Sequence, residues 1–171
     1  MVLSNSLFDG SILGGSAQSA VPEGYVLRPL ELGDYRKGFV DCLANLSVVG
    51  DITEDMFAER FGEMQRTGGS YYVVVIEDLA AQRIAASGTL LVERKMLHGC
   101  GTVGHIEDIV VASGQERKRF GQTIVTRLLA ISAAVGCYKT ILDCDDSNVA
   151  FYEKCGMTRR AVQMALYAPK Q

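Results

Sequence analysis

The sequence predicts an α/β fold, of the α+β type, with one mixed central sheet and helices on both faces. Two observations carry this expectation. Short runs of β-branched and aromatic residues recur along the chain, and segments with apolar residues at helical spacing stand between them. The chain of 171 residues, 48% of them apolar, is also long enough to bury a core without disulfide or metal support.

The first half of the chain predicts one strand, two helices and a hairpin. Residues 25–30 form a strand that Pro29 confines to an edge or an end of the sheet. Asp34 is placed to cap a helix running to about residue 46, and Thr53 opens a second helix that stops before Gly68 and Gly69. The strand-like runs 71–77 and 83–92 then resemble an antiparallel hairpin.

The second half predicts three strands and two helices. A central strand at 106–111 is followed by a long helix from Phe120 to about Val135, whose apolar residues recur at helical spacing. A short strand at 140–143, a helix at 148–155 and a last strand at 161–167 complete the order β-α-α-β-β-β-α-β-α-β.

Residues 1–23 differ from the rest of the chain. They are rich in Ser, Gly and Ala, show no sustained period, and lack the basic start and apolar core of a secretory signal. We expect a disordered lead-in at 1–23 and a single domain at 24–171.

Charge and hydropathy exclude two classes of partner. Seventeen basic against twenty acidic residues leave a net charge of −3, and the basic residues gather only at 116–119, so no footprint for nucleic acid is expected. The longest apolar stretches, such as 128–135, are far shorter than the roughly 18 residues of a membrane span, so no membrane partner is expected.

The cysteines indicate the cellular compartment of the protein, and the histidines indicate whether it binds a metal. Five scattered cysteines without CxxC spacing indicate free thiols in a reducing, cytoplasmic compartment, with import into a microbody-type organelle left open. His98 and His105 lack metal-ligand partners at useful spacing, so no metal is expected.

A basic loop, Arg117-Lys118-Arg119, enters the long predicted helix. Unpaired N–H groups and a partial positive charge at a helix N-terminus suit a phosphate or pyrophosphate. Such a cluster is also common as a plain solvated loop, and the residues alone leave both interpretations open.

Acidic residues lie within or at the end of two predicted strands, and a tyrosine lies on the short predicted helix at 148–155. Neighbours on a strand point to opposite faces, so Glu107 and Asp108 are not expected to form a close acid pair, although either could orient an amine or act as a base. Asp143 ends a strand at the sheet edge where α/β folds place ligands, and Tyr152 could give a proton to a leaving group. Packing or ion pairing explains the same residues without function.

Several sequence blocks in order are more specific than any single motif. They are Glu93-Arg94-Lys95, Gly104-His105-Ile106-Glu107-Asp108-Ile109, Gly136-Cys137-Tyr138-Lys139, Ile141-Leu142-Asp143-Cys144-Asp145 and Phe151-Tyr152-Glu153-Lys154-Cys155-Gly156. Together they resemble the Gcn5-related N-acetyltransferases (GNAT), and within them the glucosamine 6-phosphate N-acetyltransferases.

The resemblance implies a role for each matching position. Catalytic roles fall on Glu107, Asp108, Asp143 and Tyr152. Acetyl-CoA, the implied cosubstrate, is bound by Ile109, Val110, Val111, Arg117, Lys118, Arg119, Phe120, Gly121, Gln122, Asn148, Tyr152 and Lys154. The sugar and its phosphate are held by Ser47, Lys95, His98, Glu107, Asp108, Tyr138, Lys139 and Asp143.

Two positions depart from the family pattern. The pyrophosphate loop keeps only Gly121 of its usual glycines, so Arg119 must adopt a permissive backbone geometry or supply side-chain charge in place of backbone contacts. Where relatives often carry a C-terminal Arg that reaches the partner subunit's substrate, this chain has Tyr167, with Lys170 nearby.

The expected reaction is acetyl transfer from acetyl-CoA to the amine of D-glucosamine 6-phosphate, on the route to UDP-N-acetylglucosamine, by a homodimer. Two alternatives remain. One is an acetyltransferase of the same fold acting on a protein N-terminus or a small amine. The other is a non-catalytic acyl-CoA-binding module, which would tolerate loss of Glu107 and Tyr152.

Overall fold

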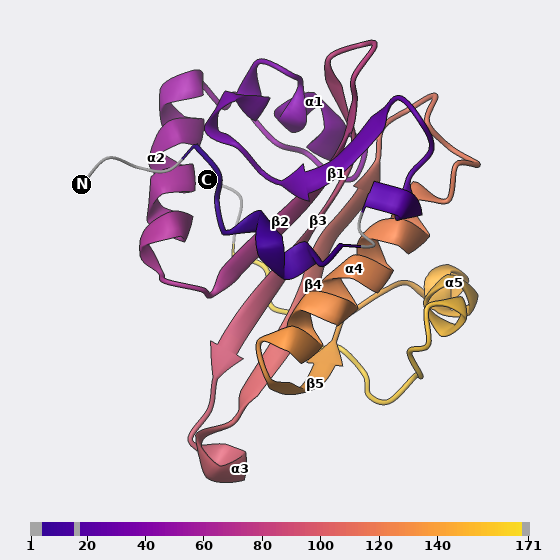
Figure 1. Ribbon diagram of the computed structural model, residues 1–171. Coiled ribbons are helices and arrows are strands. Elements are labelled where there is room, and N and C mark those ends of the chain that lie inside the picture. The colour runs from indigo at the N-terminus through magenta and orange to yellow at the C-terminus, as the bar shows by residue number, and fades with distance from the viewer. Residues whose placement is uncertain (1–4, 16–17, 169–171) are drawn as a thin grey trace.

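A computed structural model describes residues 5–15 and 18–168 and contains one five-stranded sheet in the order β1-β2-β3-β4-β5 (Figure 1). The strands are β1 Tyr25–Pro29, β2 Tyr71–Asp78, β3 Arg83–Arg94, β4 Thr102–Val111 and β5 Cys137–Ile141. The helices are α1 Phe39–Leu43, α2 Glu54–Arg66, α3 Leu97–Cys100, α4 Phe120–Ala134 and α5 Val149–Lys154. Neighbouring strands are antiparallel except β4 and β5, which are parallel, and this confirms the predicted mixed sheet.

The sheet is buried on both faces. Val74 and Ile76 of β2 point toward α4 and pack with Leu128, whereas the intervening Val73 and Val75 pack against the side of α1 and α2. This two-residue alternation within a continuous apolar run is what a sheet covered on both sides requires. No helix of the described residues is long and apolar enough to cross a membrane.

The described part of the N-terminal segment differs from the disorder predicted for residues 1–23. Leu7 and Leu13 are 5% exposed, and a 3-10 turn at Gly10–Leu13 is capped by Asp9. Arg127 of α4 donates from Nη1 to the carbonyl of Leu13 at 2.6 Å. Two apolar side chains buried within a Ser- and Gly-rich stretch are too few to produce the periodic pattern on which the prediction relied.

The helix predicted from Asp34 to residue 46 is broken in the structure. A 3-10 turn at Leu32–Tyr35 contains Asp34, and α1 begins only at Phe39 because Gly38 adopts a left-handed conformation with φ 74°. Asp34 is fully buried and caps from within the turn, where its carboxylate accepts the N–H of Glu31. The prediction of a single helix was therefore wrong, whereas Thr53 caps α2 as expected.

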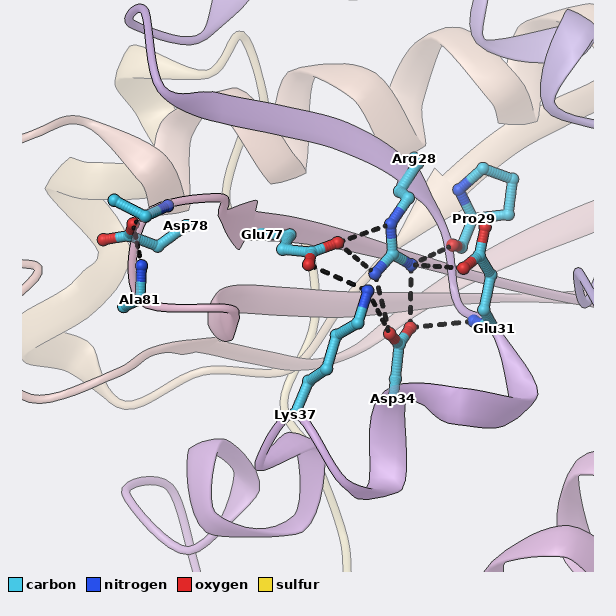
Figure 2. A network of polar contacts seen from close by, with 9 residues as sticks. Arg28, Pro29, Glu31, Asp34, Lys37, Glu77, Asp78 and Ala81 are labelled. Carbon is cyan, nitrogen blue, oxygen red and sulfur yellow. Dashed lines mark hydrogen bonds and ion pairs between the residues drawn. The ribbon is translucent and has the colours of Figure 1, made fainter.

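A network of buried charges ties this turn to the sheet (Figure 2). Arg28 of β1 donates to Asp34 at 2.7 and 2.8 Å and to Glu77 of β2 at 2.6 Å, and Lys37 reaches Glu77 at 2.8 Å. Burial disfavours the charged guanidinium, but hydrogen bonds to Asp34 and Glu77 outweigh it and raise the pKa of Arg28 above its ordinary value. Each buried charge thus has an opposite partner, which is the condition for keeping it inside a protein.

The last predicted strand is absent from the described chain. Residues 158–168 form no helix or strand, and Val162, Met164 and Leu166 are 85%, 91% and 99% exposed. A strand needs a neighbour for its backbone hydrogen bonds, and within this one chain the segment has none. The strand predicted at 161–167 therefore does not form within the described chain.

Candidate active site

A bulge interrupts β4 at the two residues that follow Glu107. The register with β3 passes from Glu107 opposite Thr89 to Val110 opposite Ser87, so Asp108 and Ile109 have no partner on that strand. Asp108 has φ 54°, in the left-handed region. Bulges of this kind bend a strand and leave backbone groups outside the ladder.

β4 and β5 also separate at this point. Their parallel pairing runs from Thr102 opposite Cys137 to His105 opposite Ile141 and then ends, while β4 continues to Val111. The chain after β5 turns away toward α5 (Figure 1). The backbone of β4 at 106–111 therefore has an edge that β5 leaves uncovered.

A cavity of about 360 Å³ lies along this uncovered edge. It is lined by Ile109, Val110, Val111, Gln115, Glu116, Arg117, Arg119, Phe120, Gly121, Gln122, Asn148, Phe151 and Tyr152. Ten of these thirteen were predicted as cofactor-binding positions. Gln115, Glu116 and Phe151 were not, although Phe151 belongs to the Phe-Tyr pair quoted for the resemblance.

The basic loop enters α4 with an unusual backbone. Arg119 precedes the helix with φ 60° and ψ 20°, and Arg117 has φ 67°. These left-handed conformations provide the permissive geometry expected of Arg119 where relatives carry glycine. At Gly121 a Cβ would lie 3.3 Å from Phe151 Cζ, a contact that is tighter than usual. Among the described residues neither arginine forms a salt bridge.

Two predicted cofactor residues stand outside the lining of this cavity. Lys118 Nζ bonds to Tyr25 Oη at 2.5 Å and to Gln115 Oε1 at 2.6 Å, which directs its charge toward β1. Lys154 is exposed at the end of α5. Lys118 thus braces the loop through a contact with a residue 93 positions away, which no local sequence pattern indicates.

Tyr152 is half-buried on α5 beside Phe151, with ring centroids 4.9 Å apart. Burial raises the pKa of Tyr152, and the nearby Cys144 and Cys155 thiols add to the rise. The phenol therefore holds its proton at neutral pH. A protonated phenol in a cavity wall is suited to donate a proton rather than to accept one.

Glu107 is one of three carboxylates that interact near the bulge. Partial burial raises the pKa of Glu107, Asp108 and Asp143 add to the rise, and His105 opposes it. Both Glu107 and Asp108 are exposed, and Asp108 departs from regular strand geometry at the bulge. Asp143 accepts a hydrogen bond from Gln163 of the C-terminal segment at 3.1 Å.

The predicted phosphate-binding residues lie at the other end of β4. His98, on the projecting α3 tip, stacks on Tyr138 with ring centroids 4.3 Å apart, and Lys139 Nζ lies 5.9 Å from the same ring (Figure 1). Lys139 pairs with Val103, four residues before Glu107, which corresponds to about 13 Å along the strand. No hydrogen bond or ion pair joins these cations to Glu107, Asp108 or Asp143 within the described chain.

Two further residues predicted to bind the sugar, Lys95 and Ser47, lie in different parts of the structure. Lys95 pairs with Glu93 at 2.5 Å, so its charge is shared with that carboxylate. Ser47 is exposed after α1, in a segment whose Asn45 accepts a hydrogen bond from the N–H of Ser113, just past β4. No cluster of three or more candidate metal ligands occurs among residues 5–15 and 18–168.

Residues 36–157 match the family model described as "Acetyltransferase (GNAT) family". The chain belongs to the GNAT acetyltransferase family. The uncovered edge of β4, the loop before α4 and the cavity between them therefore lie within the GNAT domain, and the family resemblance expected from the sequence is confirmed. GNAT acetyltransferases use acetyl-CoA as cosubstrate.

Curated relatives of this GNAT chain include glucosamine 6-phosphate N-acetyltransferases of several eukaryotes. It is 43% identical over 145 residues to the glucosamine 6-phosphate N-acetyltransferase of Arabidopsis thaliana, covering 85% of this chain and 97% of the relative. It is 42% identical over 151 residues to glucosamine 6-phosphate N-acetyltransferase 1 of Dictyostelium discoideum, covering 88% and 96%.

Solved structures agree with the sequence comparison. The crystal structure of the Arabidopsis thaliana enzyme matches with a TM-score of 0.83 at 43% identity, over 85% of this GNAT chain and 99% of that one. An acetyltransferase of Trypanosoma brucei matches with a TM-score of 0.78 at 30% identity, over 84% and 99%. The α+β fold with one mixed sheet is thereby confirmed.

Proposed function

We propose that this GNAT chain transfers the acetyl group of acetyl-CoA to the 2-amino group of D-glucosamine 6-phosphate, giving N-acetyl-D-glucosamine 6-phosphate. The relatives that share about two fifths of its residues over most of their length carry this activity in their names. The observation that carries the proposal in the molecule is the position of Glu107 and Asp108. They stand at the bulge where the cavity begins, beside Ile109.

The cavity fits acetyl-CoA. Arg117 and Arg119 stand without salt-bridge partners in the described chain at the N-terminus of a helix of 15 residues, where cationic side chains and unpaired N–H groups favour pyrophosphate. The uncovered backbone of Ile109 to Val111 provides groups for an amide-bearing arm. Acetyl-CoA supplies the acetyl group as an activated thioester.

The carboxylates act on the amine. A sugar amine is less basic than that of lysine, so part of it is already neutral at pH 7 and needs orientation more than deprotonation. Glu107 accepts a hydrogen bond or a proton from the amine nitrogen, and Asp108 and Asp143 hold the acceptor in place. A backbone N–H near Ile109 donates to the oxygen on which negative charge develops.

Tyr152 completes the transfer at the opposite end of the reacting bond. Its phenol keeps its proton because burial raises its pKa, and its hydroxyl gives that proton to the departing sulfur. The chemistry assigned to the chain thus needs one acceptor of protons on β4 and one donor of protons on α5.

A homodimer completes the site in this proposal. In one chain the cations Lys139 and His98 lie far along β4 from Glu107, and the C-terminal segment presents exposed apolar side chains at alternate positions. β5 is the last strand of the sheet, so an edge is available beside it. A second copy that covers these surfaces would bring its own cations and its C-terminal residues, including Tyr167, toward the substrate.

Measuring released CoA thiol over a panel of amines tests the proposal. Glucosamine 6-phosphate, free glucosamine, polyamines and peptides with free N-termini should be compared at equal concentration. Turnover confined to the amino sugars supports the proposal. Turnover of peptides or polyamines with no response to the sugar phosphate would favour another GNAT activity, and no turnover at all with tight acetyl-CoA binding would favour a binding module.

A further inference from the structure

Hydrogen bonds connect the basic loop before α4 to the first strand of the sheet. Lys118 Nζ donates to Tyr25 Oη at 2.5 Å and to Gln115 Oε1 at 2.6 Å, and it lies 4.7 Å from the centroid of the Tyr25 ring. Tyr25 Oη donates in turn to Gln115 Oε1 at 3.1 Å. The three side chains therefore close a ring of hydrogen bonds between the loop and β1.

Gln115 extends this ring to the turn between β2 and β3. Its Nε2 donates to Asp78 Oδ2 at 3.4 Å, and Asp78 Oδ1 accepts the N–H groups of Ala80 and Ala81 at 3.1 and 3.0 Å (Figure 2). The hydrogen bond from Ala81 is the largest of the effects that hold the pKa of Asp78 below its ordinary value, so this carboxylate is an acceptor at neutral pH. Tyr25 pairs with Asp78 in the β1–β2 register, so both anchors of the loop belong to neighbouring positions of the sheet.

The anchored loop contains two residues in a conformation that favours glycine. Arg117 has φ 67° and Arg119 has φ 60°, and a side chain makes this left-handed region costly. Such residues persist where the surrounding structure fixes them. Both arginines line the cavity, whereas Lys118, which stands between them, does not. The contacts of Lys118 are thus placed to hold both neighbours in the left-handed region.

We propose that Lys118 is a positioning residue for acetyl-CoA binding, which holds the loop through its bonds to Tyr25 and Gln115. Held in this way, the loop presents Arg117, Arg119 and the first N–H groups of α4 to the pyrophosphate. This inference rests on the proposed function, because it takes the cavity to hold acetyl-CoA. Lys118 itself touches no cofactor in this scheme, whereas the family resemblance implies direct contact, and the two roles predict different results.

Removing the partner of Lys118 distinguishes the two roles. Tyr25→Phe keeps the ring that packs on Phe120, with centroids 4.9 Å apart, and keeps the charge of Lys118, but it removes the hydroxyl. We expect the Kd for acetyl-CoA, measured by calorimetry, to rise about three- to tenfold, as the loss of one or two hydrogen bonds produces. A lysine that contacted the pyrophosphate directly would be freed by this change, and the Kd would not rise.

A double variant and a matched control complete the comparison. Lys118→Met should raise the Kd to a similar extent, and Tyr25→Phe with Lys118→Met should bind no more weakly than Lys118→Met alone, because both changes remove the same contact. At saturating acetyl-CoA the kcat should stay close to that of the wild type. Tyr35→Phe is the control, since its hydroxyl donates to the carbonyl of Ile52, outside the loop, at 2.9 Å.

Hydrogen exchange of the backbone amides of residues 114–119 in the ligand-free protein gives a readout that needs no cofactor. Exchange should be about three- to tenfold faster in Tyr25→Phe and in Lys118→Met, and unchanged in Tyr35→Phe. A higher Kd in Lys118→Met alone, with unchanged exchange, would overturn the inference in favour of direct contact. Faster exchange with an unchanged Kd would also overturn it and leave a structural role. Acetyl-CoA binding that responds to these variants, in a protein that fails to acetylate the sugar, would refute the proposed substrate and still support the inference.

Discussion

Ile109 of β4 occupies the space that a side chain on Gly88 of β3 would need. A Cβ on Gly88 would lie 2.5 Å from Ile109 Cδ1 and 2.4 Å from Ile124 Cγ2 of α4. Gly88 also falls at the gap in the β3–β4 register, opposite the bulge. The missing side chain is thus what lets the bulged strand and α4, the helix that follows the basic loop, pack onto the same point of the sheet.

Replacing Gly88 by alanine should therefore disturb the bulge. Overpacking of this kind typically costs about 1 to 3 kcal/mol, and the Cβ would press on Ile124, which is fully buried. We expect a lower free energy of unfolding in denaturant titration, together with a higher KM for acetyl-CoA. Gly33→Ala is the matched control, since nothing lies within 4 Å of a Cβ there. Equal stability of the two variants would contradict this role of Gly88.

The basic loop should bind acetyl-CoA through its free arginines. Arg117→Ala or Arg119→Ala is expected to raise KM for acetyl-CoA, and the penalty should shrink as salt rises because exposed ionic contacts are screened. Arg60→Ala removes an exposed arginine on α2, which pairs with Glu63, and serves as control. An unchanged KM for acetyl-CoA in both loop variants would indicate that the loop is an ordinary solvated segment without a role in cofactor binding.

Tyr152 should be needed for turnover more than for binding. Tyr152→Phe is expected to lower kcat about 10- to 1,000-fold while acetyl-CoA affinity, measured by calorimetry, stays close to that of the wild type, because a positioned acid contributes to the chemical step. Tyr72→Phe removes a hydroxyl that makes no hydrogen bond to the described residues and should leave kcat unchanged. Wild-type kcat in Tyr152→Phe would exclude the hydroxyl as the acid.

The sequence predicted those parts of the fold whose signal is local. The α4 periodicity, the β2–β3 hairpin and the Thr53 cap each depend on residues close together in the sequence, and all three are present. The basic loop was likewise placed correctly before a helix, since a basic run before a helical pattern is a local signal. Arg119 even adopts the left-handed backbone that the missing glycine demanded.

Features that depend on distant contacts were missed. The turn at Asp34 replaced the predicted helix, and its buried carboxylate is neutralised by Arg28 of β1, which also pairs with Glu77 of β2. The bulge at Asp108 lies opposite Gly88, which is twenty positions earlier in the chain. The residue pattern of β4 alone does not predict this bulge. For the same reason, the sequence did not predict that the strand departs from regular geometry at Asp108.

Self-association tests the explanation given for the exposed C-terminal segment. Light scattering should give a mass of about twice 18.5 kDa, because Val162, Met164 and Leu166 present an apolar face that one chain leaves uncovered. Leu166→Asp should weaken association and lower activity with the same concentration dependence. Val48→Asp, at an apolar side chain 95% exposed elsewhere on the surface, provides the control. A fully active monomer at micromolar concentration would contradict the proposed dimer.

The ratio of kcat/KM for glucosamine 6-phosphate to that for free glucosamine tests the central claim most directly. Lys139 and its neighbours are assigned to the 6-phosphate, and each charge-assisted hydrogen bond contributes about 1.5 to 3 kcal/mol, so two of them predict a ratio on the order of 10² to 10⁴. Lys139→Ala should lower turnover of the phosphorylated sugar strongly and that of glucosamine much less. Similar kcat/KM values for both sugars in the wild type would contradict the assigned substrate, even with the acetyltransferase fold intact.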